Sequence, residues 1–167
     1  MGRMAGNPWQ DAKRKTEYLQ ARYASVSPCR FYDEILGHIE DEPDFQLCAM
    51  HAQAKKGQHM RRYDDVMGML LDAGARRDAY VYPAVYYHSY ALEALMQSTS
   101  CLYIDLDHVA AKQLRRLCDA DFFGHRPTYL VNSGNGVHLV YVLQEPVQTY
   151  DWAKRLLKRI HRALLKV

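Results

Sequence analysis

The sequence predicts an α+β domain built around a mostly antiparallel sheet. Segments rich in β-branched and aromatic residues are interspersed with segments whose apolar residues recur at helical spacing. Two of the β-rich segments are separated only by a short turn with two glycines, which predicts an antiparallel hairpin. The chain has 167 residues, 49% of them hydrophobic, and is therefore long enough to bury one core.

Two helices are expected at the start of the chain, at about 8–24 and 28–40. The second begins with Ser27 and Pro28, a serine cap followed by a proline at the first helical position. The sequence Asp-Glu-Pro-Asp then interrupts the helical pattern.

A strand, a basic loop and a helix are expected next. Residues 45–53 have no decisive periodicity, and only the family resemblance described below favours a strand. Residues 55–62 are rich in lysine and arginine and predict a loop. Residues 63–75 have apolar side chains at helical spacing and predict a helix that ends near Gly74.

Residues 79–88 are dense in tyrosine and valine and predict a further strand. Pro83 cannot donate a hydrogen bond to a neighbouring strand, so this strand is expected to lie at a sheet edge or to be bulged there. Its tyrosines could stack on nucleic-acid bases, but most of them are expected to belong to the core and the sheet surface. A polar connection with a short helical stretch is expected at 90–100.

Two aspartates lie one residue apart in the apolar segment 102–109, which predicts a buried strand. Residues two apart in a strand project from the same face at about 6.5 Å, so Asp105 and Asp107 are expected to form a pair of carboxylates. Such a pair repels itself unless a cation compensates it, and Mg²⁺ and Mn²⁺ prefer oxygen ligands. Alternatively, Asp107 caps the helix expected at 109–118 and Asp105 is only solvated. For the pair, we favour the metal.

The hairpin is expected from the β-branched and aromatic segments 128–131 and 137–143, which Asn-Ser-Gly-Asn-Gly separates. Glycine and asparagine tolerate the positive φ angles of tight turns. The two glycines are also expected to leave backbone N–H groups open to an anion. His138 follows the turn and can donate a hydrogen bond to a phosphate oxygen. A single histidine in a strand is usually structural, but the upstream pair of aspartates favours a functional role.

Positive charge is unevenly distributed, although the net charge is only +3. A helix is expected at 152–167, with Trp152, Leu156 and Ile160 among the apolar residues on one side and only basic charges on the other. A basic face is usually just solvated, but without compensating acids it can bind phosphates in a salt-sensitive manner. The candidate nucleic-acid-binding residues are Lys55, Lys56, Arg61, Arg62, Lys154, Arg155, Lys158 and Arg159.

Composition disfavours several classes of protein. No run of about 18 apolar residues is present, so no membrane partner is expected. The first residues contain no apolar segment of the kind that a secretory signal needs. The cysteines show no C-x-x-C spacing, and we expect a cytoplasmic protein with reduced thiols. A zinc site is discarded because the spacing of its ligands would fit no usual finger; those ligands would be Cys101, His108, Cys118 and His125.

A strand that carries Asp-Leu-Asp, followed by Ser-Gly-Asn-Gly-Val-His at the start of a later strand, resembles the archaeo-eukaryotic primase superfamily. The likeness is to the primase-polymerases of plasmids and other mobile elements, of the RepB-like type. It implies that Asp105 and Asp107 hold Mg²⁺ or Mn²⁺ and that His138 contacts the phosphates of the incoming nucleotide. The nucleotide-binding residues that it implies are Ser133, Gly134, Asn135, Gly136 and His138.

The resemblance also implies an RRM-like catalytic core at 44–167, with residues 1–43 as a helical N-terminal extension. The implied reaction is DNA-directed nucleotidyl transfer from NTP or dNTP on a single-stranded DNA template, with a replicative helicase as a further partner. The family's third motif supplies another metal-binding acid, which neither Glu145 nor Asp151 matches. The core is therefore expected to be truncated before this acid, and the activity of these residues alone is left open.

Other functions stay open beside this one. A phosphatase of the haloacid-dehalogenase type also carries D-x-D after an apolar strand, and Val109 fits its pattern, but that motif belongs near an N-terminus. A glycosyltransferase D-x-D is not accompanied by a sugar-nucleotide signature. The main alternative is a non-catalytic nucleic-acid-binding replication module with an incomplete active site.

Overall fold

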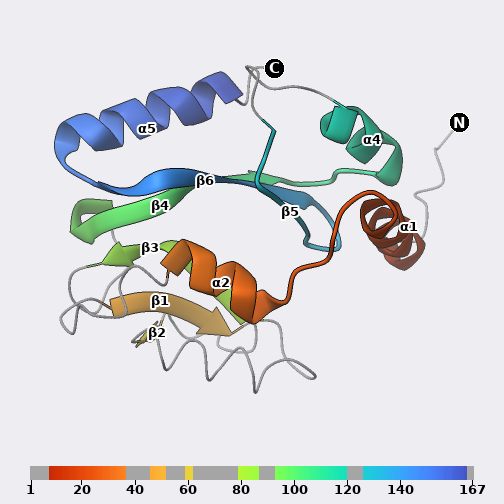
Figure 1. Cartoon of the computed structure of the whole chain (residues 1–167), viewed down its shortest axis with the longest axis horizontal. Helices are drawn as coiled ribbons and strands as arrows, with labels where there is room; N and C mark the ends of the chain where they lie inside the picture. Colours follow the sequence, from red (N-terminus) through yellow and green to blue (C-terminus); the bar gives the residue numbers. More distant parts are fainter. Residues whose placement is uncertain are drawn as a thin grey trace, which may run out of the picture. The chain divides into compact units, whose positions relative to one another are not determined.

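The computed structural model describes residues 8–36, 46–51, 59–61, 79–86, 93–119 and 126–164. Within these residues the structure is α+β, as expected (Figure 1). The helices are α1 (Pro8–Gln20), α2 (Pro28–Leu36), the 3₁₀ helix η2 (Glu93–Leu95), α4 (Ala111–Asp119) and α5 (Asp151–Leu164). The strands are β1 (Gln46–His51), β2 (His59–Arg61), β3 (Ala79–Tyr86), β4 (Met96–Leu106), β5 (Tyr129–Asn132) and β6 (Val137–Gln148).

The strands form one sheet in the order β2-β1-β3-β4-β6-β5. Every pairing whose register is described is antiparallel: β1 with β2, β1 with β3, β3 with β4, and β5 with β6. Strands β5 and β6 form the expected hairpin, in which Asn132 pairs with Val137 directly beside the turn. The mostly antiparallel sheet is therefore confirmed for the described strands.

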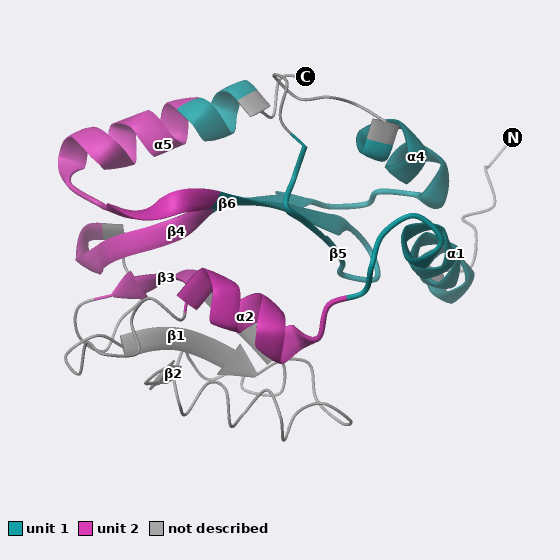
Figure 2. Cartoon of the chain, viewed as in Figure 1, with its two compact units in different colours: residues 1–25, 102–142, 160–167 teal, residues 26–101, 143–159 magenta. Residues whose placement is uncertain are grey.

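Contacts divide the chain into two compact units (Figure 2). Unit 1 comprises residues 1–25, 102–142 and 160–167, and unit 2 comprises residues 26–101 and 143–159. Helix α1 thus belongs to the same unit as the segment that carries both candidate motifs. The predicted boundary at residue 43 concerns the extent of a family core and stays a prediction.

The core of unit 1 lies under helices α1 and α4. Helix α1 contributes Tyr18 and Leu19, and α4 contributes Leu114, which is fully buried. These side chains pack against apolar residues of β4 and β6 on the sheet. The buried members of this cluster are Ile104, Val109, Leu114, Cys118, Val137 and Leu139.

The two N-terminal helices are confirmed. Helix α1 ends at Gln20, earlier than predicted, and the last part of the range predicted for the second helix, 37–40, lies outside the described residues. Helix α2 begins at Pro28, and Oγ of Ser27 accepts a hydrogen bond from the N–H of Arg30 at 3.2 Å. Ser27 is therefore the helix cap that the sequence predicted. On its inner side α2 buries Phe31 and Ile35 within unit 2.

Strand β1 confirms the strand expected at 45–53. The basic loop expected at 55–62 is wrong in part, because His59–Arg61 forms strand β2 against β1. The rest of that segment, and the helix expected at 63–75, lie outside the described residues.

Strand β3 is confirmed, and it carries a bulge at its proline. Because β3 lies between β1 and β4, Pro83 is not at a sheet edge. Leu47 pairs with Val85 and Ala49 with Val81, so the register with β1 shifts in the interval that contains Pro83. Of the two alternatives for Pro83, the structure therefore has the bulge.

Strand β4 begins within the segment that the sequence predicted to be a polar connection, and this prediction is wrong there. Ser98, Thr99 and Ser100 are buried although they are polar. Oγ1 of Thr99 donates to the carbonyl O of Pro83 at 3.1 Å, and Oγ of Ser100 donates to the carbonyl O of Ile35. Because backbone carbonyls satisfy these hydroxyls, the polar residues can be buried in a strand.

Candidate functional site

Strands β4 and β6 bring the first aspartate and the histidine together. Nε2 of His138 lies 3.2 Å from Oδ1 of Asp105. Asp105 is the penultimate residue of β4, and His138 is the second residue of β6, which is the neighbouring strand. The Asp105 side chain is 56% exposed and that of His138 is 19% exposed. The carboxylate therefore faces solvent, and the imidazole is held beside it.

Tyr103 holds the other side of the same imidazole. Its hydroxyl is within hydrogen-bond distance of Nδ1 of His138, and the two ring centroids are 5.0 Å apart. Both ring nitrogens thus have a partner, Tyr103 at Nδ1 and Asp105 at Nε2, which fixes the orientation of the ring. The sequence reasoning missed Tyr103. Its spacing of two residues from Asp105, which places both side chains on one face of a strand, is the signal that could have found it.

Asp107 lies just after β4, which ends at Leu106. The expectation that both aspartates lie within one strand is therefore wrong for Asp107. The next residue, His108, has a φ angle of 57°, in a region that residues other than glycine adopt uncommonly. The chain turns sharply there, and Asp107 stays exposed at the same end of β4 as Asp105.

The start of helix α4 is capped by residues other than Asp107. The N–H of Ala110 donates to Oε1 of Gln113 at 2.9 Å, and the N–H of Ala111 donates to Oδ1 of Asp11 at 3.1 Å. Helix α4 begins at Ala111, so Ala110 and not Asp107 stands at its cap position, and Gln113 takes the Ala110 N–H that a capping Asp107 could have bonded. The capping alternative therefore loses its main support.

We name residues 107–110 the first motif loop and residues 133–136 the second motif loop. The two glycines of the second motif loop have different roles. Gly134 has a φ angle of 87°, which strains a residue with a side chain. Gly136 is buried, and a Cβ added there would lie 2.3 Å from the carbonyl O of Leu106. Gly136 is thus required because the second motif loop packs directly against the backbone between the two aspartates.

The N–H groups of these two glycines are engaged inside the turn. The N–H of Gly134 donates to Oδ1 of Asn132 at 3.1 Å, and the N–H of Gly136 donates to Oγ of Ser133 at 3.1 Å. This differs from the expectation that the glycines leave their N–H groups open to an anion. Ser133 and Asn132 accordingly shape the turn through their side chains.

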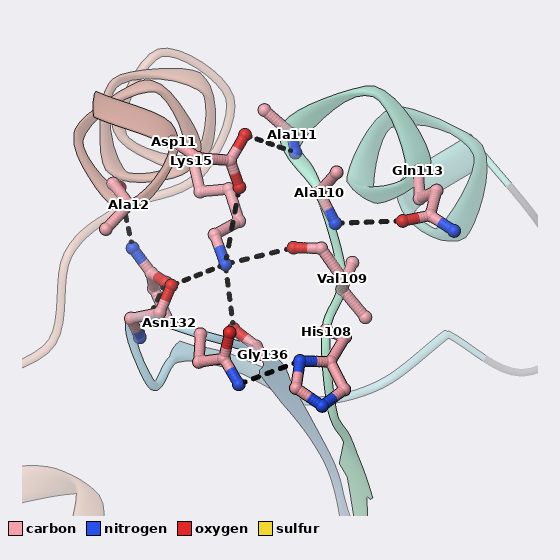
Figure 3. Close-up of polar contacts among 12 residues, drawn as sticks. Asp11, Ala12, Lys15, His108, Val109, Ala110, Ala111, Gln113, Asn132 and Gly136 are labelled. Carbon is pink, nitrogen blue, oxygen red and sulfur yellow. Dashed lines mark hydrogen bonds and ion pairs between the residues drawn. The ribbon is translucent and has the colours of Figure 1, made fainter. Parts of the chain in front are cut away.

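A buried lysine of helix α1 joins the two motif loops (Figure 3). Nζ of Lys15 donates to the carbonyl O of Val109 at 3.0 Å, of Gly134 at 2.7 Å and of Gly136 at 3.4 Å. The side chain is 0% exposed. Burial lowers the pKa of Lys15, and the carboxylate of Asp11, whose Oδ2 lies 3.9 Å from Nζ, acts in the opposite direction.

Further polar contacts tie α1 to the same region (Figure 3). Nδ2 of Asn132 donates to the carbonyl O of Ala12 at 3.0 Å and to Oγ1 of Thr16 at 2.9 Å. Between the motif loops themselves, Nδ2 of Asn135 lies 3.1 Å from Nδ1 of His108. Helix α1 therefore helps to hold the candidate site, although no motif drew attention to it.

The candidate residues on α5 lie on a solvent-facing arc of the helix. Arg155, Lys158 and Arg159 are exposed, and Lys154 is half-buried beside the packed side. Of the earlier group, only Arg61 is described, as the last residue of β2. The remaining candidates, Lys55, Lys56 and Arg62, lie outside the described residues.

Only part of the apolar side of α5 is buried. Ala153 is buried, whereas Trp152 is 60% exposed, Leu156 is 47% exposed and Ile160 is 37% exposed. The three large apolar residues Trp152, Leu156 and Ile160 are therefore exposed. At 100° per residue they form a stripe next to the basic arc, while Ala153 and Leu157 make up the packed side.

The candidate ligands suit an ion such as Mg²⁺, which needs few protein ligands, better than an ion that is enclosed by protein side chains. Among the described residues, no three His, Cys, Asp or Glu side chains are grouped closely enough to hold a metal. Mg²⁺ is usually held by one or two carboxylates together with water and substrate phosphates. Asp105 and Asp107 are exposed carboxylates of this kind.

No protein-family model, no curated protein and no solved structure matches the chain. In the part of the chain that the structure describes, none of the helices has the length and apolar character needed to cross a membrane.

Proposed function

We propose that the protein is a primase-polymerase, a nucleotidyltransferase that joins NTP or dNTP on a single-stranded DNA template in plasmid or mobile-element replication. The observation that carries this proposal is the 3.2 Å contact between Nε2 of His138 and Oδ1 of Asp105 at the exposed end of two neighbouring strands. Asp107 follows directly, and the second motif loop packs against the backbone between the aspartates. Carboxylates and an imidazole suit a metal-bound triphosphate.

The chain's residues have distinct roles in the proposed reaction. Asp105 and Asp107 would hold Mg²⁺ or Mn²⁺, which supplies charge compensation for the triphosphate and the departing pyrophosphate. Nε2 of His138 faces the carboxylate side, so it is the nitrogen that a phosphate oxygen beside Asp105 would meet. If the Tyr103 hydroxyl donates to Nδ1, the N–H of the neutral imidazole is on Nε2. That N–H can then donate to the phosphate oxygen.

The proposed template is bound by charge and stacking. Arg155, Lys158 and Arg159 on α5 can neutralise phosphates, and exposed Trp152 beside them offers a surface for bases. A replicative helicase is proposed as a further partner on the family resemblance alone.

Nucleotide incorporation tests the proposed reaction. Labelled dNTP or NTP is supplied with Mn²⁺ or Mg²⁺ and single-stranded template, and binding of the triphosphate is measured in parallel. Binding needs the two carboxylates and His138, whereas turnover also needs the family's third acid. We expect the wild-type protein to bind the triphosphate in a cation-dependent manner, and Asp105→Ala/Asp107→Ala to abolish this binding together with any incorporation. The exposed Asp33 of α2 provides a matched control, because Asp33→Ala removes a carboxylate in the other unit. A protein that binds DNA normally but neither binds nor incorporates triphosphate would overturn the proposal.

The second candidate is a non-catalytic module that binds single-stranded DNA. The exposed Trp152 next to the basic arc of α5 favours it independently of the aspartates. DNA binding that is unaffected by Asp105→Ala and by chelators, together with no triphosphate binding, would support this candidate. A phosphatase would instead hydrolyse phosphate esters without any template.

A further inference from the structure

We infer that Lys15 is a positioning residue: its buried ammonium orients the Gly134–Asn135 peptide so that the N–H of Asn135 is presented to a nucleotide phosphate. The inference rests on the proposed function and deepens it. It assigns a role in nucleotide binding to helix α1, which carries none of the motifs.

The orientation follows from the geometry of the peptide group. The carbonyl O of Gly134 is 2.7 Å from Nζ of Lys15, the shortest of the contacts that Nζ makes with carbonyls. In a trans peptide the C=O and the following N–H lie in one plane and point in opposite directions, and among the described residues there is no cis peptide bond. Since the carbonyl of Gly134 points to a fully buried ammonium, the N–H of Asn135 points away from that ammonium, and Asn135 is an exposed residue.

The hydrogen bonds of the turn single out Asn135 among its neighbours. The N–H of Gly134 is taken by Asn132 and the N–H of Gly136 by Ser133. The N–H of Asn135 lies between these two engaged donors. The Asn135 side chain lies 3.1 Å from Nδ1 of His108 in the first motif loop. The donor is therefore next to the loop that begins with Asp107.

The ammonium also strengthens the donor electrostatically. Lys15 has three N–H donors, and they face the carbonyl oxygens of Val109, Gly134 and Gly136. A cation that is hydrogen bonded to a carbonyl polarises the peptide, which makes its N–H a better donor to an anion. The positive charge beneath the turn acts in the same direction.

Amide shifts of the full chain test the inference directly. Uniformly ¹⁵N-labelled protein is titrated with dATP in the presence of Mg²⁺, and the amide signals of residues 133–136 are followed. In the wild-type protein we expect the Asn135 amide to shift further than those of Gly134 and Gly136. In Lys15→Met we expect the dissociation constant of dATP to rise by about tenfold, which is the effect of losing one hydrogen bond to a charged group.

The matched control is Lys13→Met, since Lys13 is exposed on the same helix and pairs across the surface with Glu17. We expect it to leave the dATP dissociation constant unchanged. A purely structural role of Lys15 would reduce the folded fraction, and hence the amount of dATP bound, without changing the dissociation constant of the folded molecules.

The outcomes separate the inference from the function on which it rests. A Lys15→Met protein that binds dATP as tightly as wild type, with the same Asn135 shift, overturns the inference and leaves the proposed function standing. No shift at either motif loop in the wild type overturns both. If Lys15→Met does not fold, the wild-type titration decides: a larger shift at Gly134 or Gly136 than at Asn135 overturns the inference.

Discussion

Individual residues in the motif loops have roles that their neighbours of the same type do not share. Gly136 is needed for close packing, and Gly134 for its positive φ angle. His138 is oriented by Tyr103 as well as by Asp105. These distinctions lead to predictions in which two residues of one type must respond differently.

The glycines are the first such pair. Gly136→Ala places a methyl group against the backbone carbonyl of Leu106 and is expected to lower the free energy of unfolding by about 3 kcal/mol or more. A Cβ at residue 134 has no atom within 4 Å. Gly134→Ala is therefore expected to lower the free energy of unfolding only through the strain of the left-handed conformation, by about 1–2 kcal/mol. Urea unfolding of both variants measures the difference. Equal losses in the two proteins would show that the motif loops do not pack as described.

Tyr103→Phe removes only the hydroxyl that reaches Nδ1 of His138. Because the imidazole then loses one of its two partners, we expect dATP affinity to fall severalfold while the free energy of unfolding falls by about 1 kcal/mol. Calorimetric titration with dATP and Mg²⁺ measures the affinity. The control is Tyr150→Phe, since Tyr150 is exposed in the other unit and should leave the affinity unchanged.

The thiols are expected to differ in reactivity. Burial raises the pKa of Cys101 to about 12, so at pH 8 almost none of it is thiolate in the folded protein, whereas Cys29 is only half-buried. Brief alkylation at pH 8, read by mass spectrometry of the two peptides, should modify Cys29 well before Cys101. In denaturant the difference should disappear. Equal rates in the folded protein would contradict the burial of Cys101.

At the scale of elements, helix α5 combines a basic arc with an exposed apolar stripe. Its amphipathic sequence predicted a helix correctly, but not which part of its apolar side is buried. The stripe of Trp152, Leu156 and Ile160 is exposed, and the small Ala153 marks the packed side. Helical spacing gives the angles between residues, whereas the neighbouring sheet decides which angle is buried.

The two parts of α5 should contribute differently to DNA binding. Arg155→Ala/Arg159→Ala is expected to weaken binding of single-stranded DNA and to reduce the slope of log K against log salt by about 0.7 per charge removed. Trp152→Ala is expected to weaken binding by about 1–3 kcal/mol through lost stacking, with the slope unchanged. Fluorescence anisotropy across a salt series measures both quantities. Lys13→Ala, on another helix, serves as the control, and an equal effect there would refute a specific role of α5.

Most elements were predictable from local patterns, and the failures have physical causes. The turn glycines predicted the hairpin, and the Ser27 cap predicted the start of α2, because both signals depend on neighbouring residues. The start of β4 was missed because buried Thr99 and Ser100 look like loop residues until their acceptors on β3 and α2 are known. Those acceptors belong to other elements, and no local pattern reports them.

At the scale of the whole molecule, the candidate site depends on contacts between distant parts of the sequence. Asp105 and His138 could be proposed from their motifs, and the structure brings them into contact. The role of Lys15 could not be proposed from the sequence. It follows two other basic residues, a pattern typical of an exposed segment, and its acceptors lie about a hundred residues away. The sequence thus indicated the side chains with chemistry, but not the helix that holds their loops.

The claim that the two motif loops form one metal and nucleotide site is tested most directly by paramagnetic relaxation. Mn²⁺ and dATP are added together to ¹⁵N-labelled protein, and the broadening of each amide signal is measured. We expect the strongest broadening at residues 103–108 and 133–139, and its loss in Asp105→Asn/Asp107→Asn. Broadening that is concentrated elsewhere, or that persists without the two carboxylates, would contradict this claim.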